Sequence, residues 1–203
     1  MKIIRVPQRS LEWYEARRGI PTASNFNKIV TSNGSPSKQA EGYLYQLVAE
    51  RLAGVREEAY ISPAMLEGIA REAESRRVYA MLREVEVEEV GFCIDDSGRY
   101  GCSPDGLIGE DGVLELKNPQ GKAAVEYLVS GTLPTAYVQQ VQGQLLVTGR
   151  EWCDFVSYYP GLPTLIVRVE RDEVFVSKLR DALEAFCDKL DEVCKVIRDE
   201  SHS

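Results

Sequence analysis

The chain has 203 residues, of which 44% are hydrophobic and 28% are charged, and its formal net charge at pH 7 is −8. This composition is typical of a soluble globular protein with enough chain for a sizeable core, and one domain is expected at this length. No apolar run approaches membrane-spanning length and no signal peptide opens the sequence, so we expect a cytoplasmic protein without a membrane partner.

Cysteine and histidine usage excludes several classes of enzyme. The five cysteines form no Cys-x-x-Cys pair, which argues against a disulfide framework, a zinc knuckle or an iron–sulfur cluster and favours a reducing cytoplasm. The single histidine is His202, in a polar tail. This scarcity excludes Ser-His-Asp triads, Cys-His pairs and histidine-based zinc hydrolases. Any catalysis is therefore expected to use carboxylates, lysine and metal.

Charge is distributed unevenly along the sequence. Residues 1–38 contain seven basic and two acidic side chains, a net charge of +5, whereas the remaining 165 residues carry −13. A basic segment on an acidic body suits a surface that faces phosphates. A basic face that only contacts solvent explains the same charges, so charge alone leaves both interpretations open.

The first part of the chain predicts a layer of helices. A short helix is expected over 10–18, and a second over about 22–30, with a hydroxyl available as its N-cap. Residues 31–37 form a Ser/Gly/Pro loop, which we expect to be the most mobile segment. A third helix is expected over 39–53.

A longer helix is predicted from Ser62, as N-cap, and Pro63 to about Arg83. Its predicted apolar stripe consists of Met65, Ile69, Ala73 and Ala80. Glu72 falls on the margin of this stripe and is the one acid of the helix aimed near the core. An ion pair with Arg76 at i, i+4 accounts for this acid without a function, and the helix sequence alone favours that explanation.

The stretch 100–118 carries the strongest chemical signal. A strand over 85–95 and a turn at 96–98 lead into it, and it predicts two short strands with a tight connection. Its turn dipeptides are Asp105-Gly106 and Asp111-Gly112.

The second of these strands presents different chemistry on its two faces. Because side chains alternate along a strand, Leu114 and Leu116 share one face, and Glu115 and Lys117 share the other. A hairpin return could bring Asp105 near Glu115, and two converging carboxylates suit Mg²⁺ or Mn²⁺. The lysine could position a water or balance charge on a phosphate. A solvated hairpin with a cross-strand ion pair is the competing interpretation.

The remaining sequence completes an α/β pattern. The predicted elements are helices over 120–130 and 134–147, strands over 151–159 and 164–170, and a final helix capped by Asp172. In the second helix, Gln140 and Gln144 lie beside an apolar stripe. The stripe of the final helix is expected to serve core or subunit packing, and consists of Phe175, Leu179, Leu183, Phe186, Leu190, Val193 and Ile197. The element order predicts an α/β core with an N-terminal helical layer.

These residues resemble a known nuclease family. Ser103-Pro104-Asp105-Gly106 followed by Glu115-x-Lys117 resembles the PD-(D/E)xK nuclease signature. More closely, most of the chain resembles the lambda-type phage exonucleases, or YqaJ-like viral recombinases. The other matching residues are Trp13, Arg17, Gly19, Thr22-Ala23-Ser24, Gly68, Glu72, Asp95, Leu107, Leu114, Leu116, Tyr137, Gln140-Val141-Gln142 and Glu170-Arg171-Asp172-Glu173. Five matching segments in the family's order make the resemblance specific.

The resemblance implies an architecture and an assembly. It implies one restriction-endonuclease-like nuclease domain over 1–203, with a central mixed β-sheet flanked by helices. Residues 1–60 would be the helical part that faces the DNA end, and 61–203 the nuclease core and C-terminal helix. A homotrimeric ring threaded by linear double-stranded DNA is also implied, with a single-strand annealing protein as partner.

The resemblance also implies roles for individual residues. Those implied at a catalytic Mg²⁺, for which Mn²⁺ would substitute, are Asp105, Glu115, the backbone carbonyl of Leu116 and, in an assisting role, Glu72. Those implied at a terminal 5′ phosphate are Arg17, Ser24 and Ser103. Lys117 would orient or activate the attacking water, and Gln140 would support the site from the helix behind. Asp95 lies at a position that the family associates with the active site.

The sequence therefore predicts a Mg²⁺-dependent 5′→3′ exonuclease that digests linear duplex DNA and leaves a 3′ single strand for phage-type recombination. A restriction-like endonuclease or a single-strand exonuclease of the same fold is the alternative, and the cysteine spacing disfavours an iron–sulfur relative. A catalytically silent DNA-end-binding module is an alternative of another class. The complete set of Asp105, Glu115 and Lys117 argues against it.

Overall fold

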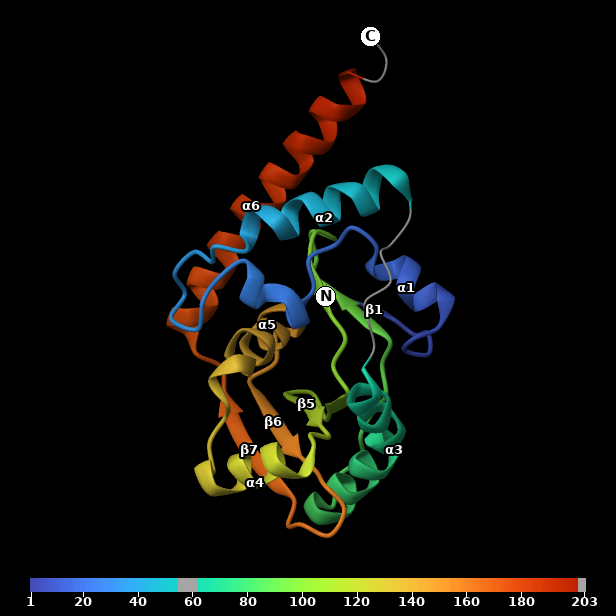
Figure 1. Cartoon of the computed structure of the whole chain (residues 1–203), viewed down its shortest axis with the longest axis vertical. Helices are drawn as coiled ribbons and strands as arrows, with labels where there is room; N and C mark the ends of the chain where they lie inside the picture. Colours follow the sequence, from blue (N-terminus) through green and yellow to red (C-terminus); the bar gives the residue numbers. More distant parts are fainter. Residues whose placement is uncertain (55–61, 201–203) are drawn as a thin grey trace.

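The computed structural model describes residues 1–54 and 62–200 and has a mixed α/β architecture, as predicted (Figure 1). Its α-helices are α1 (Leu11–Arg17), α2 (Ala40–Ala53), α3 (Pro63–Arg83), α4 (Gly121–Ser130), α5 (Val138–Thr148) and α6 (Glu173–Glu200). Two short 3-10 helices are η1 (Ala23–Lys28) and η2 (Thr135–Tyr137). The strands are β1 (Lys2–Ile4), β2 (Phe92–Ile94), β3 (Gly101–Cys102), β4 (Gly106–Ile108), β5 (Gly112–Lys117), β6 (Trp152–Ser157) and β7 (Leu165–Glu170).

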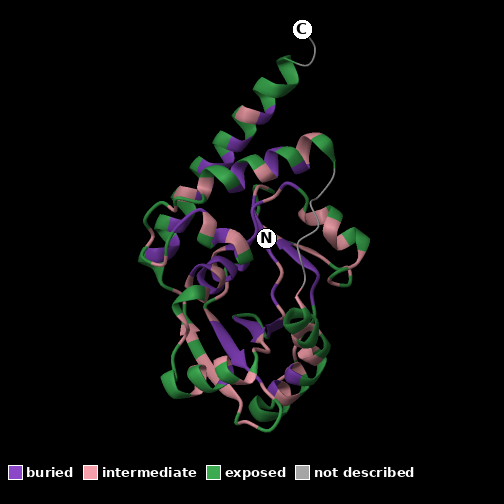
Figure 2. Ribbon diagram, in the orientation of Figure 1, coloured by how far each residue is buried: buried purple, intermediate pink, exposed green. Residues whose placement is uncertain are grey.

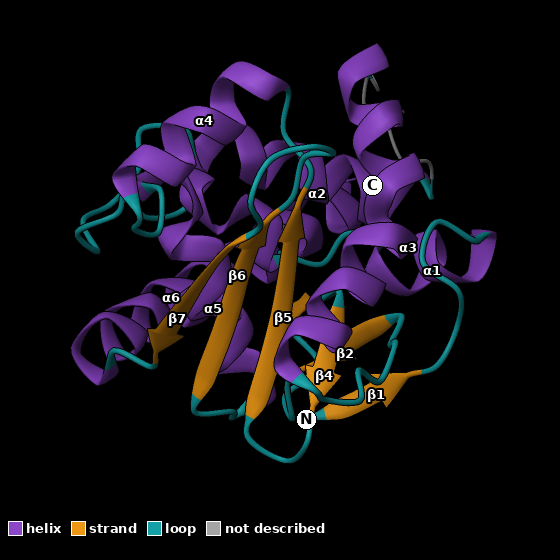
Figure 3. Ribbon diagram, turned by 90° about the horizontal axis from the view of Figure 1, so that it is seen from below, coloured by secondary structure: helices purple, strands orange, loops and turns teal. Residues whose placement is uncertain are grey.

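The described strands form two sheets. The larger has the order β4-β5-β6-β7 and is mixed, because β5 and β6 are parallel while the outer pairs are antiparallel. The smaller sheet, β1-β2-β3, is antiparallel. Figure 3 shows the long strands β5, β6 and β7 side by side. The predicted central mixed sheet is thus present, and β1 is an element that the sequence did not predict.

Both faces of the larger sheet are covered. Val113 of β5 and Phe155 of β6 face the main core, which also includes side chains of η1, α2, α5 and α6. Leu114 and Leu116 face a smaller core closed by Tyr79 of α3. The predicted alternation along β5 is confirmed, and Figure 2 shows the strands as the buried centre of this part of the molecule.

The final helix owes its position to the predicted apolar stripe. The stripe residues that are buried are Phe175, Leu179, Leu183, Phe186 and Leu190. Phe186 stacks on Tyr43 of α2, with ring centroids 5.8 Å apart. Ile197, by contrast, is 43% exposed, and the end of α6 extends beyond the rest of the described chain (Figure 1). Core packing therefore accounts for most of the stripe.

The segment before β2 differs from the prediction. A strand was expected over 85–95, but regular pairing covers Phe92–Ile94 only. Glu88 makes an isolated bridge to Leu107, with backbone hydrogen bonds of 2.9 Å in both directions. The alternating pattern is typical of a strand, but the segment passes between the two sheets and meets a partner strand at one point.

Only the second of the two predicted turn dipeptides, Asp111-Gly112, lies at the hairpin turn. Asp105-Gly106 is not a hairpin turn, because Gly106 already belongs to β4. A Cβ atom at Gly106 would lie 2.2 Å from the Val87 side chain, so close packing requires the glycine. The hairpin turn occupies 109–111, and Gly112 begins β5.

The predicted stripe of α3 is also wrong. The buried residues of this helix are Ser75 and Tyr79, whereas Met65 is 53% exposed and Ala73 is exposed. Helix α3 packs on β5 through its Ser75–Tyr79 face, so that Met65, Ile69 and Ala73 line open clefts instead. An apolar side chain at a cleft gives the same sequence signal as one in a core.

The N-terminal layer is confirmed, with one change. Ser10 caps α1 by accepting a hydrogen bond from the Trp13 amide. The second helix is the short 3-10 helix η1, and the Thr22 hydroxyl makes no capping hydrogen bond to it. Residues 31–37 connect η1 to α2, and their mobility stays a prediction.

Several remaining expectations concern the whole chain. None of the described helices combines the length and hydropathy needed to cross a membrane. All five cysteines are buried free thiols. His202 and the boundary between the predicted parts 1–60 and 61–203 lie outside the described residues, so the division of the chain stays a prediction.

Candidate active site

One cleft of about 440 Å³ collects the residues that the sequence singled out. Its lining includes all but one of them, namely Arg17, Ser24, Glu72, Ser103, Asp105, Glu115, Leu116, Lys117 and Gln140. They come from α1, η1, α3, the β3–β4 connection, β5 and α5. Asp95 is absent from this lining. A second cleft of about 590 Å³ adjoins the first and shares part of its wall.

Asp105 is held against the edge of β5. Its amide donates to the Leu114 carbonyl at 3.0 Å, and its Oδ2 atom accepts from the Leu116 amide at 2.6 Å. Burial raises the pKa of the Asp105 carboxyl well above its usual range, and the negative charges of Glu115 and Glu72 raise it further. The ionised form of Asp105 is therefore costly without a nearby cation.

Glu115 is fixed by a cage of side-chain donors. The residue is 2% exposed. Its Oε1 atom accepts from Gln140 Nε2 at 2.6 Å and lies 2.5 Å from Lys117 Nζ, while Oε2 accepts from Gln144 Nε2 at 2.5 Å. Gln140 thus contacts the site from α5, as the resemblance implied. Gln144 was not assigned a role, although its position one turn from Gln140 was a usable signal.

Lys117 is a charged group in this arrangement. Burial alone would lower the pKa of its ammonium group, but the carboxylates of Glu115 and Asp105 raise the pKa overall. The ammonium also donates to Gln140 Oε1 at 3.3 Å and lies 4.8 Å from the centre of the Tyr137 ring. Lys117 is therefore suited to donate hydrogen bonds to a water or a phosphate rather than to accept a proton.

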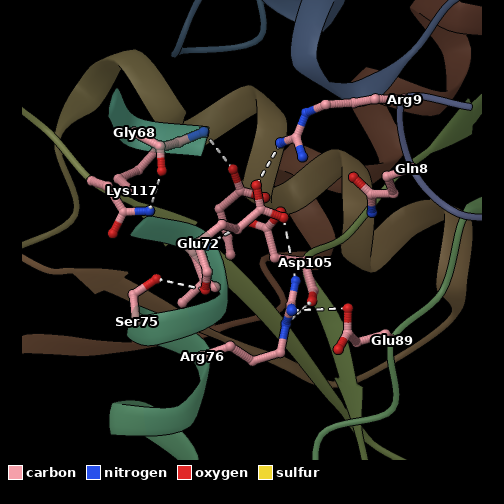
Figure 4. Close-up of polar contacts among 12 residues, drawn as sticks. Gln8, Arg9, Gly68, Glu72, Ser75, Arg76, Glu89, Asp105 and Lys117 are labelled. Atoms are coloured by element: carbon pink, nitrogen blue, oxygen red, sulfur yellow. Dashed lines mark hydrogen bonds and ion pairs between the residues drawn. The ribbon is translucent and has the colours of Figure 1, made fainter. Parts of the chain in front are cut away.

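Glu72 lies between two arginines (Figure 4). Its Oε1 atom is 3.2 Å from Arg76 Nη2, and its Oε2 atom is 2.5 Å from Arg9 Nη2. The ion pair with Arg76 that the sequence favoured is present, and Glu72 nevertheless lines the cleft beside Asp105. The two interpretations of this acid are therefore compatible.

The approach of α3 to the site depends on Gly68. A Cβ atom at this position would lie 3.3 Å from the Asn118 carbonyl oxygen, tighter than most side-chain contacts. The Gly68 carbonyl in turn accepts a hydrogen bond from Asn118 Nδ2 at 3.1 Å. This contact joins α3 to the residue that follows β5 and keeps Glu72 near the carboxylates.

The donor set fits a hard divalent cation in part. Asp105 and Glu115 supply oxygen ligands of the kind that Mg²⁺ and Mn²⁺ prefer, and the raised pKa of Asp105 reflects its burial and, next, the negative charge of its neighbours. Among residues 1–54 and 62–200, no three acidic, cysteine or histidine side chains converge as a metal-binding group. Glu72 is instead held by its arginines.

Arg17 and Ser103 form the other end of the cleft. Arg17 Nη1 donates to Ser103 Oγ at 2.6 Å, and Trp13 Nε1 donates to the same oxygen at 3.0 Å. The Arg17 guanidinium also lies over the Trp13 ring, 4.0 Å from its centre. Ser24 is exposed, with its hydroxyl 3.4 Å from that of Thr22. Arg17 and Ser103 are therefore in contact and Ser24 lines the same cleft, while the phosphate-binding role that the resemblance implied stays a prediction.

Asp95 serves the turn between β2 and β3. Its Oδ1 atom accepts from the amides of Arg99 and Tyr100, and its Oδ2 atom accepts from the amide of Ser97. Burial would raise the pKa of Asp95, but hydrogen bonds from these partners lower it overall. The structure gives Asp95 a local structural role and does not bring it into either cleft.

The YqaJ-like viral recombinase domain matches residues 12–151. The alkaline exonuclease LHK-Exo from Laribacter hongkongensis is 31% identical, with a TM-score of 0.87 over 95% of this chain and 98% of that one. Its complex with dAMP gives a TM-score of 0.86 at 30% identity over the same shares.

A more distant structure supports the fold alone. A phage-related exonuclease from Haemophilus somnus 129PT has a TM-score of 0.67 and 12% identity, over 88% of this chain and 96% of that one. The comparison with curated proteins gave no match. Because the family match covers more than half of the sequence and the fold agrees throughout, the chain belongs to the YqaJ-like viral recombinase family.

Proposed function

We propose that this protein is a Mg²⁺-dependent 5′→3′ exonuclease. It digests linear double-stranded DNA from 5′-phosphorylated ends and leaves 3′ single strands for phage-type recombination. Family membership and the likeness to an alkaline exonuclease support a nuclease. The observation that carries the proposal is the single cleft that joins a carboxylate pair, a lysine and a guanidinium–hydroxyl group.

The carboxylate end of the cleft would perform the hydrolysis. Asp105 and Glu115, with the Leu116 carbonyl, would hold Mg²⁺ or Mn²⁺, and Glu72 would assist. Such an ion, when bound, generates a nucleophile from water and offsets charge on the phosphate. The ammonium of Lys117 would donate to the water or to the phosphate oxygens.

The amide cage supports this chemistry without reacting. Gln140 and Gln144 each donate to one oxygen of Glu115 and hold its carboxylate in one orientation. Their neutral amides orient the Glu115 carboxylate without cancelling its charge, and Lys117, 2.5 Å from Oε1, is its charged partner.

The other end of the cleft would select the DNA terminus. A terminal phosphate carries about two negative charges near neutral pH, more than an internal phosphodiester. Arg17 supplies a bidentate cation, and Ser103 and Ser24 supply hydroxyls. Because Ser103 is two residues from Asp105, it would set the distance between the terminal phosphate and the cleaved bond. Each cleavage would then produce the next substrate end.

The assembly and the partner belong to the same proposal. We propose a homotrimeric ring threaded by DNA, which passes its 3′ strand to a single-strand annealing protein in the cytoplasm of the host cell. Family membership is the support for both. Light scattering of the purified protein tests the first, with a mass of three chains expected.

A single assay tests the activity. Linear and closed circular duplexes are incubated with Mg²⁺ or with EDTA, using Asp105→Asn as the inactive control. The proposal predicts digestion of the linear duplex with Mg²⁺ only. Cleavage of the circle would favour the restriction-like endonuclease, and binding without cleavage would favour the silent end-binding module.

A further inference from the structure

The two arginines at Glu72 are held very differently. Arg76 has three attachments, because its Nε donates to the Asp105 carbonyl at 3.0 Å and its Nη1 lies 2.8 Å from Glu89 in addition to its bond to Glu72. The Arg76 side chain is 14% exposed. The Arg9 side chain is 40% exposed, and among the described residues its one ion pair is with Glu72. Arg9 is therefore the partner that can leave.

The backbone aims Arg9 at the site. Its φ angle is +68°, and among the described non-glycine residues only the helix-ending Glu84 shares a positive φ. Residues other than glycine rarely adopt this conformation unless the surrounding structure imposes it. The conformation occurs in the turn before α1, where the Ser10 amide donates to the Pro7 carbonyl at 3.1 Å. A strained turn thus presents the guanidinium to Glu72, as Figure 4 shows.

Arg9 lies where the two clefts meet. The residues common to both linings are Gln8, Arg9, Ile69, Glu72 and Asp105. The second cleft also has Arg5 and Arg76 in its wall, together with the acids Glu72, Glu89 and Asp105. Arg5 is paired with Glu88 and Arg76 with Glu89, so Arg9 is the guanidinium that would bind phosphate oxygens there once it leaves Glu72.

We infer that Arg9 is a positioning residue that acts through Glu72. Without DNA, it holds the Glu72 carboxylate away from the metal site. When metal and DNA load together, it releases Glu72 toward the metal and binds a phosphate of the DNA strand in the second cleft. This inference rests on the proposed nuclease function and adds an arginine that couples metal loading to the presence of DNA.

The energetics allow such an exchange. A partly exposed ion pair contributes little free energy in water. Losing the Arg9–Glu72 pair should therefore change the metal affinity by only about two- to fivefold. Glu72 is also close enough to Asp105 for its charge to raise the pKa of that carboxyl. Glu72 lines the same cleft as Asp105 and Glu115, so a rotation of its side chain would bring a third carboxylate toward them.

The test measures metal affinity without DNA. Mn²⁺ is titrated calorimetrically into the full chain for wild type, Arg9→Gln and Arg5→Gln. Arg5→Gln is the matched control, since Arg5 lines the same cleft and pairs with Glu88 instead of Glu72. We expect Arg9→Gln to bind Mn²⁺ about two- to fivefold more tightly than wild type, and Arg5→Gln to leave the affinity unchanged.

A double-mutant cycle shows whether Glu72 carries the effect. In a Glu72→Gln background, Arg9→Gln should no longer tighten Mn²⁺ binding. Equal or weaker binding by Arg9→Gln in the wild-type background would overturn the inference, as would an equal gain in Arg5→Gln. If neither wild type nor Arg9→Gln binds Mn²⁺, the proposed metal-dependent function itself fails.

The second half of the inference concerns DNA. In Ca²⁺, with Asp105→Asn present to prevent cleavage, Arg9→Gln should weaken binding of a linear duplex by about three- to tenfold. The exchange predicts that Arg9→Gln changes the two affinities in opposite directions: Mn²⁺ binds more tightly and DNA binds more weakly. If Arg9→Gln leaves the DNA affinity unchanged, Arg9 does not bind a DNA phosphate, and this half of the inference is wrong.

Discussion

The two walls of the cleft hold their carboxylates by different means. On the β5–α5 wall, Glu115 is 2% exposed and is held by two amides and one ammonium. On the α3 wall, Glu72 is 15% exposed and held by two guanidinium groups. Two of the three donors to Glu115 are neutral amides that can stay in place when a divalent cation arrives, whereas Lys117 and both guanidinium groups at Glu72 repel it. The difference indicates a preorganised wall and an adjustable one.

The preorganised wall should be the most sensitive to mutation. Asp105→Asn removes a carboxylate beside β5 and should lower turnover by at least about 10³-fold, because the metal loses an anionic ligand. Initial rates on linear duplex measure this loss. Activity within tenfold of wild type would break the assignment of this wall to the chemistry.

The pH dependence of stability should also differ between Asp105→Asn and wild type. Because the pKa of Asp105 is raised in the folded, metal-free protein, the unfolding free energy should fall as pH rises from the ordinary carboxyl pKa of about 4 toward the raised value. Asp105→Asn has no carboxyl group at this position, so its unfolding free energy should not fall for this reason as pH rises. Its Tm in EDTA at pH 8 should therefore equal or exceed that of wild type, and a clearly lower Tm would contradict the account of the burial.

Lys117→Ala should have the next largest effect. Its ammonium is placed to donate in the transition state, so turnover should fall by about 10²-fold while DNA binding stays measurable. Single-turnover rates and binding in Ca²⁺ separate these quantities. If binding weakens and the rate at saturation does not, Lys117 is a phosphate anchor only.

Arg17→Ala tests the far end of the cleft. Loss of charged hydrogen bonds should slow digestion of 5′-phosphorylated ends by roughly 10- to 100-fold and leave 5′-hydroxyl ends nearly unchanged. Arg18→Ala is the control, since Arg18 donates to the Gly54 carbonyl and is not part of the cleft. A wild-type enzyme indifferent to the 5′ phosphate would rule the pocket out.

Gln144→Leu should give the smallest of these effects on rate. It leaves one oxygen of the buried Glu115 without its donor, which should lower the unfolding free energy by about 1–3 kcal/mol and turnover by about tenfold. Gln142→Leu is the matched control on the same helix, because Gln142 donates to the Glu170 carbonyl outside the site. Equal activity losses in both variants would indicate a purely structural role for Gln144.

Local patterns were sufficient to predict much of the site. The period of two along β5 placed Glu115 and Lys117 on one face, and the helical period placed Gln140 and Gln144 together. The helix pattern favoured only an ion pair for Glu72, and its stripe was wrong, so the place of Glu72 at the site came from the family resemblance. The predictions for β5 and α5 succeeded because each depends on residues a few positions apart.

The missed features depend on contacts that are distant in sequence. Arg9 and Glu72 are 63 positions apart in the sequence. Their contact depends on a positive φ at Arg9, which an arginine in the sequence does not predict. Gly106 is required by the Val87 side chain and not by a turn. The three-residue strand β1 forms only because β2 offers it an edge. Neither propensity nor periodicity carries such information.

The most direct test of the account follows the first product from a labelled end. A linear duplex carrying a radioactive 5′ phosphate is mixed with enzyme and Mg²⁺, and the labelled products are resolved at short times. We expect a labelled mononucleotide as the first product, because the terminal phosphate would bind at Arg17 and Ser103 beside Asp105. Labelled strands that shorten gradually, or internal fragments, would contradict a 5′→3′ exonuclease at this cleft.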